Sequence, residues 1–113
     1  MSGISNGTID VDASTAELTE SDRHRLLASE RRRVVLEVLD GSTASIALEE
    51  LARQVAARES GRDVVDAEAA ERVAVSLHHT HLPKMANLGV LRYDPVVRRI
   101  DPFGYSLDSL RTD

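Results

Sequence analysis

Apolar residues recur along most of this chain with the spacing of helices. After Ser29, the segment ERRRVVLEVLD carries valine and leucine at i, i+1, i+4 and i+5, which predicts an amphipathic helix. Ser29 has the residue type of its N-cap, and Gly41 stands where a left-handed C-cap is expected. The apolar pair Leu26 and Leu27 indicates a shorter helix that ends near Ser29.

Two further helices are expected in the middle of the chain. Ile46 lies in a short β-prone stretch, and from about Ala47 the apolar positions return at helical spacing until Gly61. After a loop, Asp66 has the residue type of an N-cap. A long helix is therefore predicted over about 66–88.

The apolar spacing changes from the helical period to simple alternation after Gly89. The segment VLRYDPVVRRID predicts two short strands joined at a turn, that is, a hairpin over about 90–101. The C-terminal segment PFGYSLDSL is expected to add a short helical turn packed by Phe103 and Leu107.

Residues 1–16 contain no periodic apolar positions, and we predict a disordered or loosely docked tail there. Residues 17–113 are then expected to form a single domain, because 113 residues suffice for one core that folds without disulfides or metals. The order of the elements is helix, helix, short strand, helix, long helix, hairpin. The predicted fold class is mainly α with a small β-hairpin, an α+β fold.

From about Leu26 to Asp101 the chain resembles winged helix-turn-helix domains of halophilic archaea. The segments LLASERRRVVLEVL, LEELARQVAARE and VSLHHTHLPKMANLGVLRYD carry the resemblance, and the last is the most specific. The first two would fit many winged-helix regulators of the arsenic-repressor or PadR type. The resemblance implies a winged helix-turn-helix fold, with the hairpin as the wing, and a predicted transcription regulator or signalling module.

Charge composition is consistent with a halophilic origin. The chain has 19 acidic residues, a net charge of −5, and 14 cationic residues of which only Lys84 is a lysine. Excess surface carboxylate keeps proteins soluble in molar salt, although a high-GC genome would give the same preference for arginine. An acidic mean charge argues against nucleic-acid binding, and that argument is weaker for a protein adapted to high salt.

Several kinds of chemistry lack their sequence signals. Without cysteine there is no disulfide framework, thiolate zinc site or cysteine nucleophile. The chain also lacks a hydrolase elbow, a P-loop and a glycine-rich dinucleotide turn. No apolar run approaches the roughly 20 residues that span a bilayer, and the first residues do not resemble a signal peptide. We expect a cytoplasmic protein that is not an enzyme, needs no cofactor and does not contact membranes.

Three histidines lie within four positions of the long helix, in the segment HHTH. At about 100° per residue, His81 falls on the same face as Val73 and Leu77, so we expect a core histidine bonded to a backbone carbonyl or a carboxylate. His78 and His81 are three residues apart, but no further ligand stands at a diagnostic spacing. We therefore predict no metal site.

The opposite face of the long helix is polar, and a winged helix offers this face to the major groove of DNA. Pro83 also lies on it, and because proline lacks an N–H, a kink or a broken turn is expected nearby. The residues predicted to contact base edges or phosphates are Arg72, Ser76, His79 and Thr80.

The hairpin adds a second set of cations. If Pro95 and Val96 form the turn, the facing pairs are Leu91 with Ile100, Arg92 with Arg99 and Tyr93 with Arg98. Two arginines facing each other are destabilising, and a phosphate between them would relieve the repulsion. The alternative is that Asp94 and Asp101 neutralise them. We predict that Arg92, Arg98 and Arg99 hold the flanking DNA backbone or minor groove.

The densest positive run, Arg31 to Arg33, admits two interpretations. On a helix these side chains fan over about 200°, so they cannot all contact one partner. They either pair with Glu30 and Glu37 in solvent or contact phosphate, and we expect Arg32 or Arg33 to be exposed.

Together these features predict a sequence-specific DNA-binding transcription regulator, with double-stranded DNA as its partner. Val75 and Leu82 are expected to form an apolar face for a homodimer. The loop from Glu59 to Val65 is longer than the three or four residues of a compact helix-turn-helix. A protein interaction module that does not bind DNA is therefore the alternative.

Overall fold

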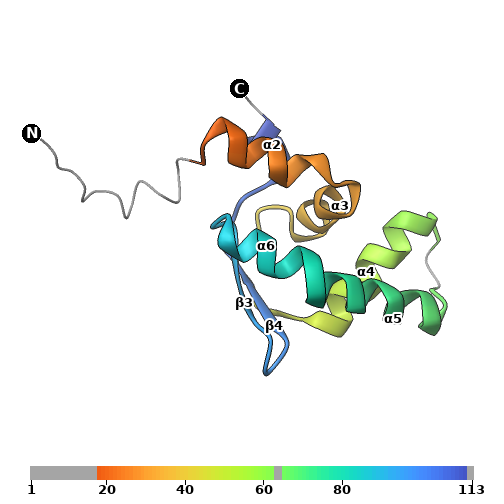
Figure 1. Ribbon diagram of the computed structural model, residues 1–113. Coiled ribbons are helices and arrows are strands. Elements are labelled where there is room, and N and C mark those ends of the chain that lie inside the picture. The colour runs from red at the N-terminus through yellow and green to blue at the C-terminus, as the bar shows by residue number, and fades with distance from the viewer. Residues whose placement is uncertain (1–17, 63–64, 112–113) are drawn as a thin grey trace, which may run out of the picture.

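The structure is a computed structural model that describes residues 18–62 and 65–111 (Figure 1). It is mainly helical with one small three-stranded antiparallel sheet, which confirms the predicted α+β class. The predicted tail, residues 1–16, lies outside the described residues. The elements are α2 (Glu20–Ala28), α3 (Glu30–Leu39), β2 (Ile46–Ala47), α4 (Leu48–Ser60), α5 (Ala67–Ser76), the π-helical turn η1 (Leu77–His81), α6 (Leu82–Asn87), β3 (Leu91–Asp94), β4 (Arg99–Pro102) and α7 (Leu107–Arg111).

Helix α3 begins as predicted and ends one residue earlier than predicted. The Ser29 hydroxyl accepts a hydrogen bond from the backbone N–H of Arg32, at 3.3 Å, and so caps the helix. The left-handed C-cap is Asp40, with φ of 38°, whereas Gly41 was expected in this place. Gly41 follows with φ of 77° and donates its N–H to the carbonyl of Tyr105. Aspartate tolerates the left-handed region, so Asp40 can serve as the C-cap although the next residue is a glycine.

Helices α4 and α5 form at the expected places. Gly61 is the left-handed C-cap of α4, with φ of 71°. The N–H of Leu48 in the first turn of α4 donates to the carbonyl of Arg98, which joins this helix to the hairpin. Asp66 occupies the N-cap position of α5, but its side chain makes no cap hydrogen bond.

The long predicted helix runs as α5, η1 and α6 in succession. In η1 the N–H of Leu82 donates to the carbonyl of Leu77, five residues back. Pro83 stands in the first turn of α6, where the missing N–H costs least. The predicted break is confirmed, and it takes the form of a π turn on the N-terminal side of the proline.

The sheet has the strand order β2-β4-β3. Its hairpin pairs Leu91 with Pro102, Arg92 with Asp101, Tyr93 with Ile100 and Asp94 with Arg99. The predicted register is therefore wrong by two residues, because the turn spans four residues, 95–98, and not two. The Arg98 N–H donates to the Asp94 carbonyl at 2.7 Å, and Arg98 adopts a φ of 58° to close this turn. A shift of two residues leaves each side chain on its predicted face.

The core lies between the helices and the inner face of the sheet. Its fully buried side chains include Leu26, Val35, Leu51, Val55, Leu77, Leu82, Met85 and Ile100. In the C-terminal segment Leu107 is buried as predicted, but Phe103 is 41% exposed and does not belong to the core cluster.

Leu82 was predicted on an exposed dimer face, and this prediction is wrong because the side chain is completely buried. A π turn advances fewer degrees per residue than an α turn, so the residues after Leu77 are rotated relative to the 3.6-residue period. Val75 precedes the π turn and is 53% exposed, as predicted.

Candidate functional site

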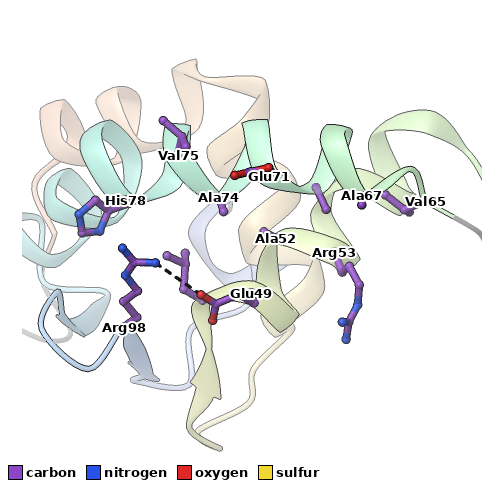
Figure 2. A pocket seen from close by; sticks show the side chains of 12 residues that line it. Glu49, Ala52, Arg53, Val65, Ala67, Glu71, Ala74, Val75, His78 and Arg98 are labelled. Carbon is purple, nitrogen blue, oxygen red and sulfur yellow. Dashed lines mark ion pairs between the residues drawn. The ribbon is translucent and has the colours of Figure 1, made fainter.

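A groove of about 580 Å³ lies between α4, α5 and the turn of the hairpin (Figure 2). Its apolar lining consists mainly of small side chains, with Ala52 and Ala74 on facing helices. Its polar lining is Glu49, Arg53, Glu71, His78 and Arg98. Arg98 reaches across from the hairpin, and its Nη1 lies 3.6 Å from Oε2 of Glu49 (Figure 2).

Most of the helix residues predicted to contact DNA are accessible. Arg72, His79 and Thr80 are exposed, and Ser76 is partly exposed. Arg72 and Ser76 line a second hollow with Glu68, Glu71 and Val75. Glu71 and Val75 also line the groove. Glu71 and Val75 therefore join the two hollows into one continuous surface. We call it the α5–hairpin surface; it extends from Glu68, Arg72 and Ser76 on α5 to Arg98 at the hairpin turn.

The α5–hairpin surface is not uniformly positive. Glu68 lies four residues before Arg72 and Glu71 lies one residue before it, and both glutamates are exposed. At helical spacing Glu68 is a direct neighbour of Arg72. An anion that approaches Arg72 therefore also meets two carboxylates.

His78 connects the helix to the hairpin. Its Nδ1 and the Tyr93 Oη share a hydrogen bond of 2.6 Å, and the two rings meet edge to face with centroids 5.8 Å apart. The reasoning from sequence missed this pair. The two residues are 15 positions apart and no local signal links them, so only the packing of β3 against η1 brings them together.

His81 is partly buried, but its partner differs from the prediction. Its Nδ1 lies 3.4 Å from Nη1 of Arg32, so it contacts a guanidinium and not a carbonyl or a carboxylate. A guanidinium only donates, so Nδ1 accepts, which requires a neutral ring with its proton on Nε2. Burial lowers the pKa of His81, and the charges of Arg32 and Arg31 lower it further, while Glu59 raises it.

The run of three arginines joins helices together. The guanidinium of Arg32 donates to the carbonyls of Arg25, at 2.7 Å, and Leu26, at 3.3 Å, and Arg33 donates to the carbonyl of Leu27. These carbonyls belong to the last turns of α2, where intrahelical partners are missing. Arg32 and Arg33 are partly buried, so the predicted exposure of one of them is wrong.

The first arginine of the run also has a structural partner. Arg31 donates from Nε and Nη2 to the two carboxylate oxygens of Glu59, both at 2.7 Å. Glu37 pairs with Arg58, at 3.5 Å. The predicted pairing of the run with Glu30 and Glu37 is therefore replaced by a bond between α3 and the end of α4.

The hairpin arginines are exposed and weakly paired. Arg92 faces Asp101 and not Arg99, with Nη1 3.9 Å from Oδ2, so the predicted repulsion between two arginines is absent from this pair. Of the alternative, the pairing of Asp101 with Arg92 is confirmed, whereas the Asp94 carboxylate accepts hydrogen bonds from the N–H groups of Val96 and Val97. Arg99 donates from Nε to the Ser45 hydroxyl at 3.0 Å.

Within residues 18–62 and 65–111, no group of three or more histidine, aspartate or glutamate side chains is placed to hold a metal ion. No helix in the same described part of the chain has the length and apolar character to cross a membrane.

Comparison with known proteins assigns a family. No curated protein and no solved structure matches this chain. The model of one family, described as a domain of unknown function (DUF7344), matches residues 24–101. This range contains the helices from α3 to α6, strands β2 and β3, strand β4 except its last residue, and the whole α5–hairpin surface. The chain therefore belongs to the DUF7344 family.

Proposed function

We propose that this protein is a DNA-binding transcription regulator of the winged helix-turn-helix type. In this proposal α5 and η1 enter the major groove, and the hairpin is the wing that holds the flanking backbone. The order α3, β2, α4, α5, β3, β4 agrees with that of a winged helix, and β2 completes the sheet by pairing with β4. The observation that carries the proposal is the continuous α5–hairpin surface, since one DNA duplex would contact both parts.

The exposed arginines of α5 and of the hairpin are available to phosphate. The side chains of Arg92 and Arg98 are 71% and 55% exposed. Exposed ion pairs of this kind contribute about 0 to 1 kcal/mol, so a phosphate displaces Asp101 or Glu49 at little cost. Arg72 and Arg99 are also exposed.

Electrostatics set the expected salt dependence. Glu68 and Glu71 oppose phosphate binding in dilute salt, whereas at about 1 M salt the Debye length is only about 3 Å and their repulsion is screened. Each neutralised phosphate contributes a slope of about −0.9 to the plot of log affinity against log salt. With Arg72, Arg92, Arg98 and Arg99 each neutralising one phosphate, the expected slope is about −3.6.

Fluorescence anisotropy tests this proposal. The protein is titrated against DNA from upstream of its own gene and against a scrambled duplex, from about 0.2 M to about 2 M potassium chloride. The double variant Arg92→Glu, Arg99→Glu is expected to lose binding, because it reverses two hairpin charges. Arg23→Glu with Arg25→Glu is the matched control on α2, which lies far from the hairpin (Figure 1), and it should retain binding. No binding above the scrambled duplex at any salt concentration would contradict the proposal.

The second candidate is a protein interaction module that does not bind DNA. It is favoured by the apolar lining of the groove and by the 53% exposure of Val75 at its edge. Val75→Asp should then abolish partner binding, whereas Arg92→Glu with Arg99→Glu should leave it intact.

The proposed homodimer now depends on Val75, because Leu82 is in the core. Sedimentation of the full chain tests it directly. A well-folded monomer at micromolar concentration would contradict the dimer.

A further inference from the structure

The turn of the hairpin carries two exposed valines. Val96 is 87% exposed and Val97 is 60% exposed, more than the other large apolar side chains in the described part of the chain. Figure 1 shows that the hairpin projects from the helical body at this end. Packing within the domain therefore gives no reason for two valines at this position.

The turn holds these valines in a fixed arrangement. Oδ1 of Asp94 accepts hydrogen bonds from the backbone N–H groups of Val96 and Val97, at 3.0 and 3.4 Å. On the other side, the carbonyl of Arg98 accepts the N–H of Leu48 at 2.9 Å, which ties the turn to the start of α4. A tip that is already ordered loses little conformational entropy when it binds a partner.

The charges around the tip indicate the kind of partner. The Asp94 carboxylate is directed at the N–H groups of its own turn. Arg98 and Arg99 follow the valines directly in the chain, and both residues are exposed. Arg98 pairs with Glu49 at 3.6 Å and Arg99 donates to the Ser45 hydroxyl at 3.0 Å, and a phosphate can replace either exposed partner at little cost. An apolar tip followed by two cations is complementary to the minor groove of DNA, where arginine enters the groove and an apolar side chain wedges between bases.

We propose that Val96 and Val97 form an apolar wedge that enters the minor groove and partly unstacks one base step. Arg98 and Arg99 hold phosphates next to the tip. The wedge selects double-stranded DNA with a flexible pyrimidine–purine step under the tip, because such steps unstack most easily. This inference rests on the proposed function and adds to it a means of choosing sequence without base-edge hydrogen bonds.

The test uses the full chain and a duplex with 2-aminopurine next to a TA step, whose fluorescence rises when the base unstacks. Wild-type protein should raise the fluorescence. Val96→Ser with Val97→Ser should abolish the rise and weaken binding about tenfold, because it removes apolar burial. The salt slope should not change, since valine releases no counterions. Val96→Ile with Val97→Ile is the matched control and should keep both the fluorescence rise and the affinity.

The outcomes separate the wedge from the proposed function. If the serine variant binds the duplex and raises its fluorescence like wild type, the wedge is overturned and the regulator proposal stands. If wild-type protein does not bind the duplex at all, both fail. If the serine variant keeps DNA binding but loses self-association, or loses binding to phosphatidylglycerol vesicles, the tip contacts a second copy or a lipid surface and the wedge is overturned. Thermal melts should show equal stability for all variants, because both valines are exposed.

Discussion

Arg32 offers the sharpest test of how the helices are held together. Its guanidinium leaves α3 and reaches both the last turns of α2 and the π turn, through the carbonyls of Arg25 and Leu26 and through Nδ1 of His81. Arg32→Met keeps most of the length of the side chain and its apolar character but removes every one of these donors. The variant therefore measures the hydrogen bonds separately from the packing of the stem.

The expected loss follows from these bonds. A hydrogen bond with a charged donor contributes about 1.5 to 3 kcal/mol, and the value is lower here because Arg32 is only partly buried and water can replace it at the carbonyls. The bond to the Arg25 carbonyl, at 2.7 Å, is the strongest, and the contacts to Leu26 and His81 are longer. We expect Arg32→Met to lower the free energy of unfolding by about 2 kcal/mol, and the melting temperature by roughly 8 to 16 °C.

Urea unfolding followed by circular dichroism measures this change directly. Arg72→Met is the matched control, since Arg72 is exposed and its replacement should change stability by no more than about 0.5 kcal/mol. A loss for Arg32→Met no larger than that of the control would refute the reasoning. It would mean that water satisfies the α2 carbonyls as well as the guanidinium does.

Three further predictions concern His81, Leu82 and Tyr93. Burial and nearby arginines lower the pKa of His81 in the folded protein, so as the pH falls the histidine of the unfolded chain is protonated first. The free energy of unfolding should therefore fall as the pH drops below about 6.5. Urea midpoints measured between about pH 7.5 and 5 should fall less steeply for His81→Gln than for the wild-type protein. Leu82→Ala should lower the free energy of unfolding, measured with urea, by about 2 to 5 kcal/mol, and Val75→Ala should lower it by less than about 1 kcal/mol. Equal losses for the two variants would contradict the burial of Leu82. Tyr93→Phe should lower stability by about 1 kcal/mol through loss of the 2.6 Å bond to His78, and an unchanged melting temperature would show that this bond contributes nothing net.

The candidate site was predictable in part. The helical period placed Arg72 on an exposed face, because the direction of a side chain on a regular α-helix follows from its position in the sequence. His79 is exposed as predicted, although it lies in the π turn. The partners of the hairpin arginines were not predictable in the same way. Glu49 reaches Arg98 from a helix that begins 50 residues earlier in the chain.

The amino-acid sequence by itself determined the elements whose signals are local. Ser29 caps α3, Gly61 ends α4, and the change of period after Gly89 marks the hairpin, because each of these depends on interactions among residues a few positions apart. This information sufficed for the α+β class and for the order of the elements.

Only the tertiary structure decided how these elements meet. The π turn rotated Leu82 into the core, and the four-residue turn shifted the hairpin by two positions. Arg32 turned from a predicted surface cation into a bridge between helices. The contacts of Arg32 join segments far apart in sequence, and the π turn and the four-residue turn are local backbone conformations that packing selects. The pattern of apolar and polar residues along the chain carries no information about which distant segments meet or which turn conformation forms.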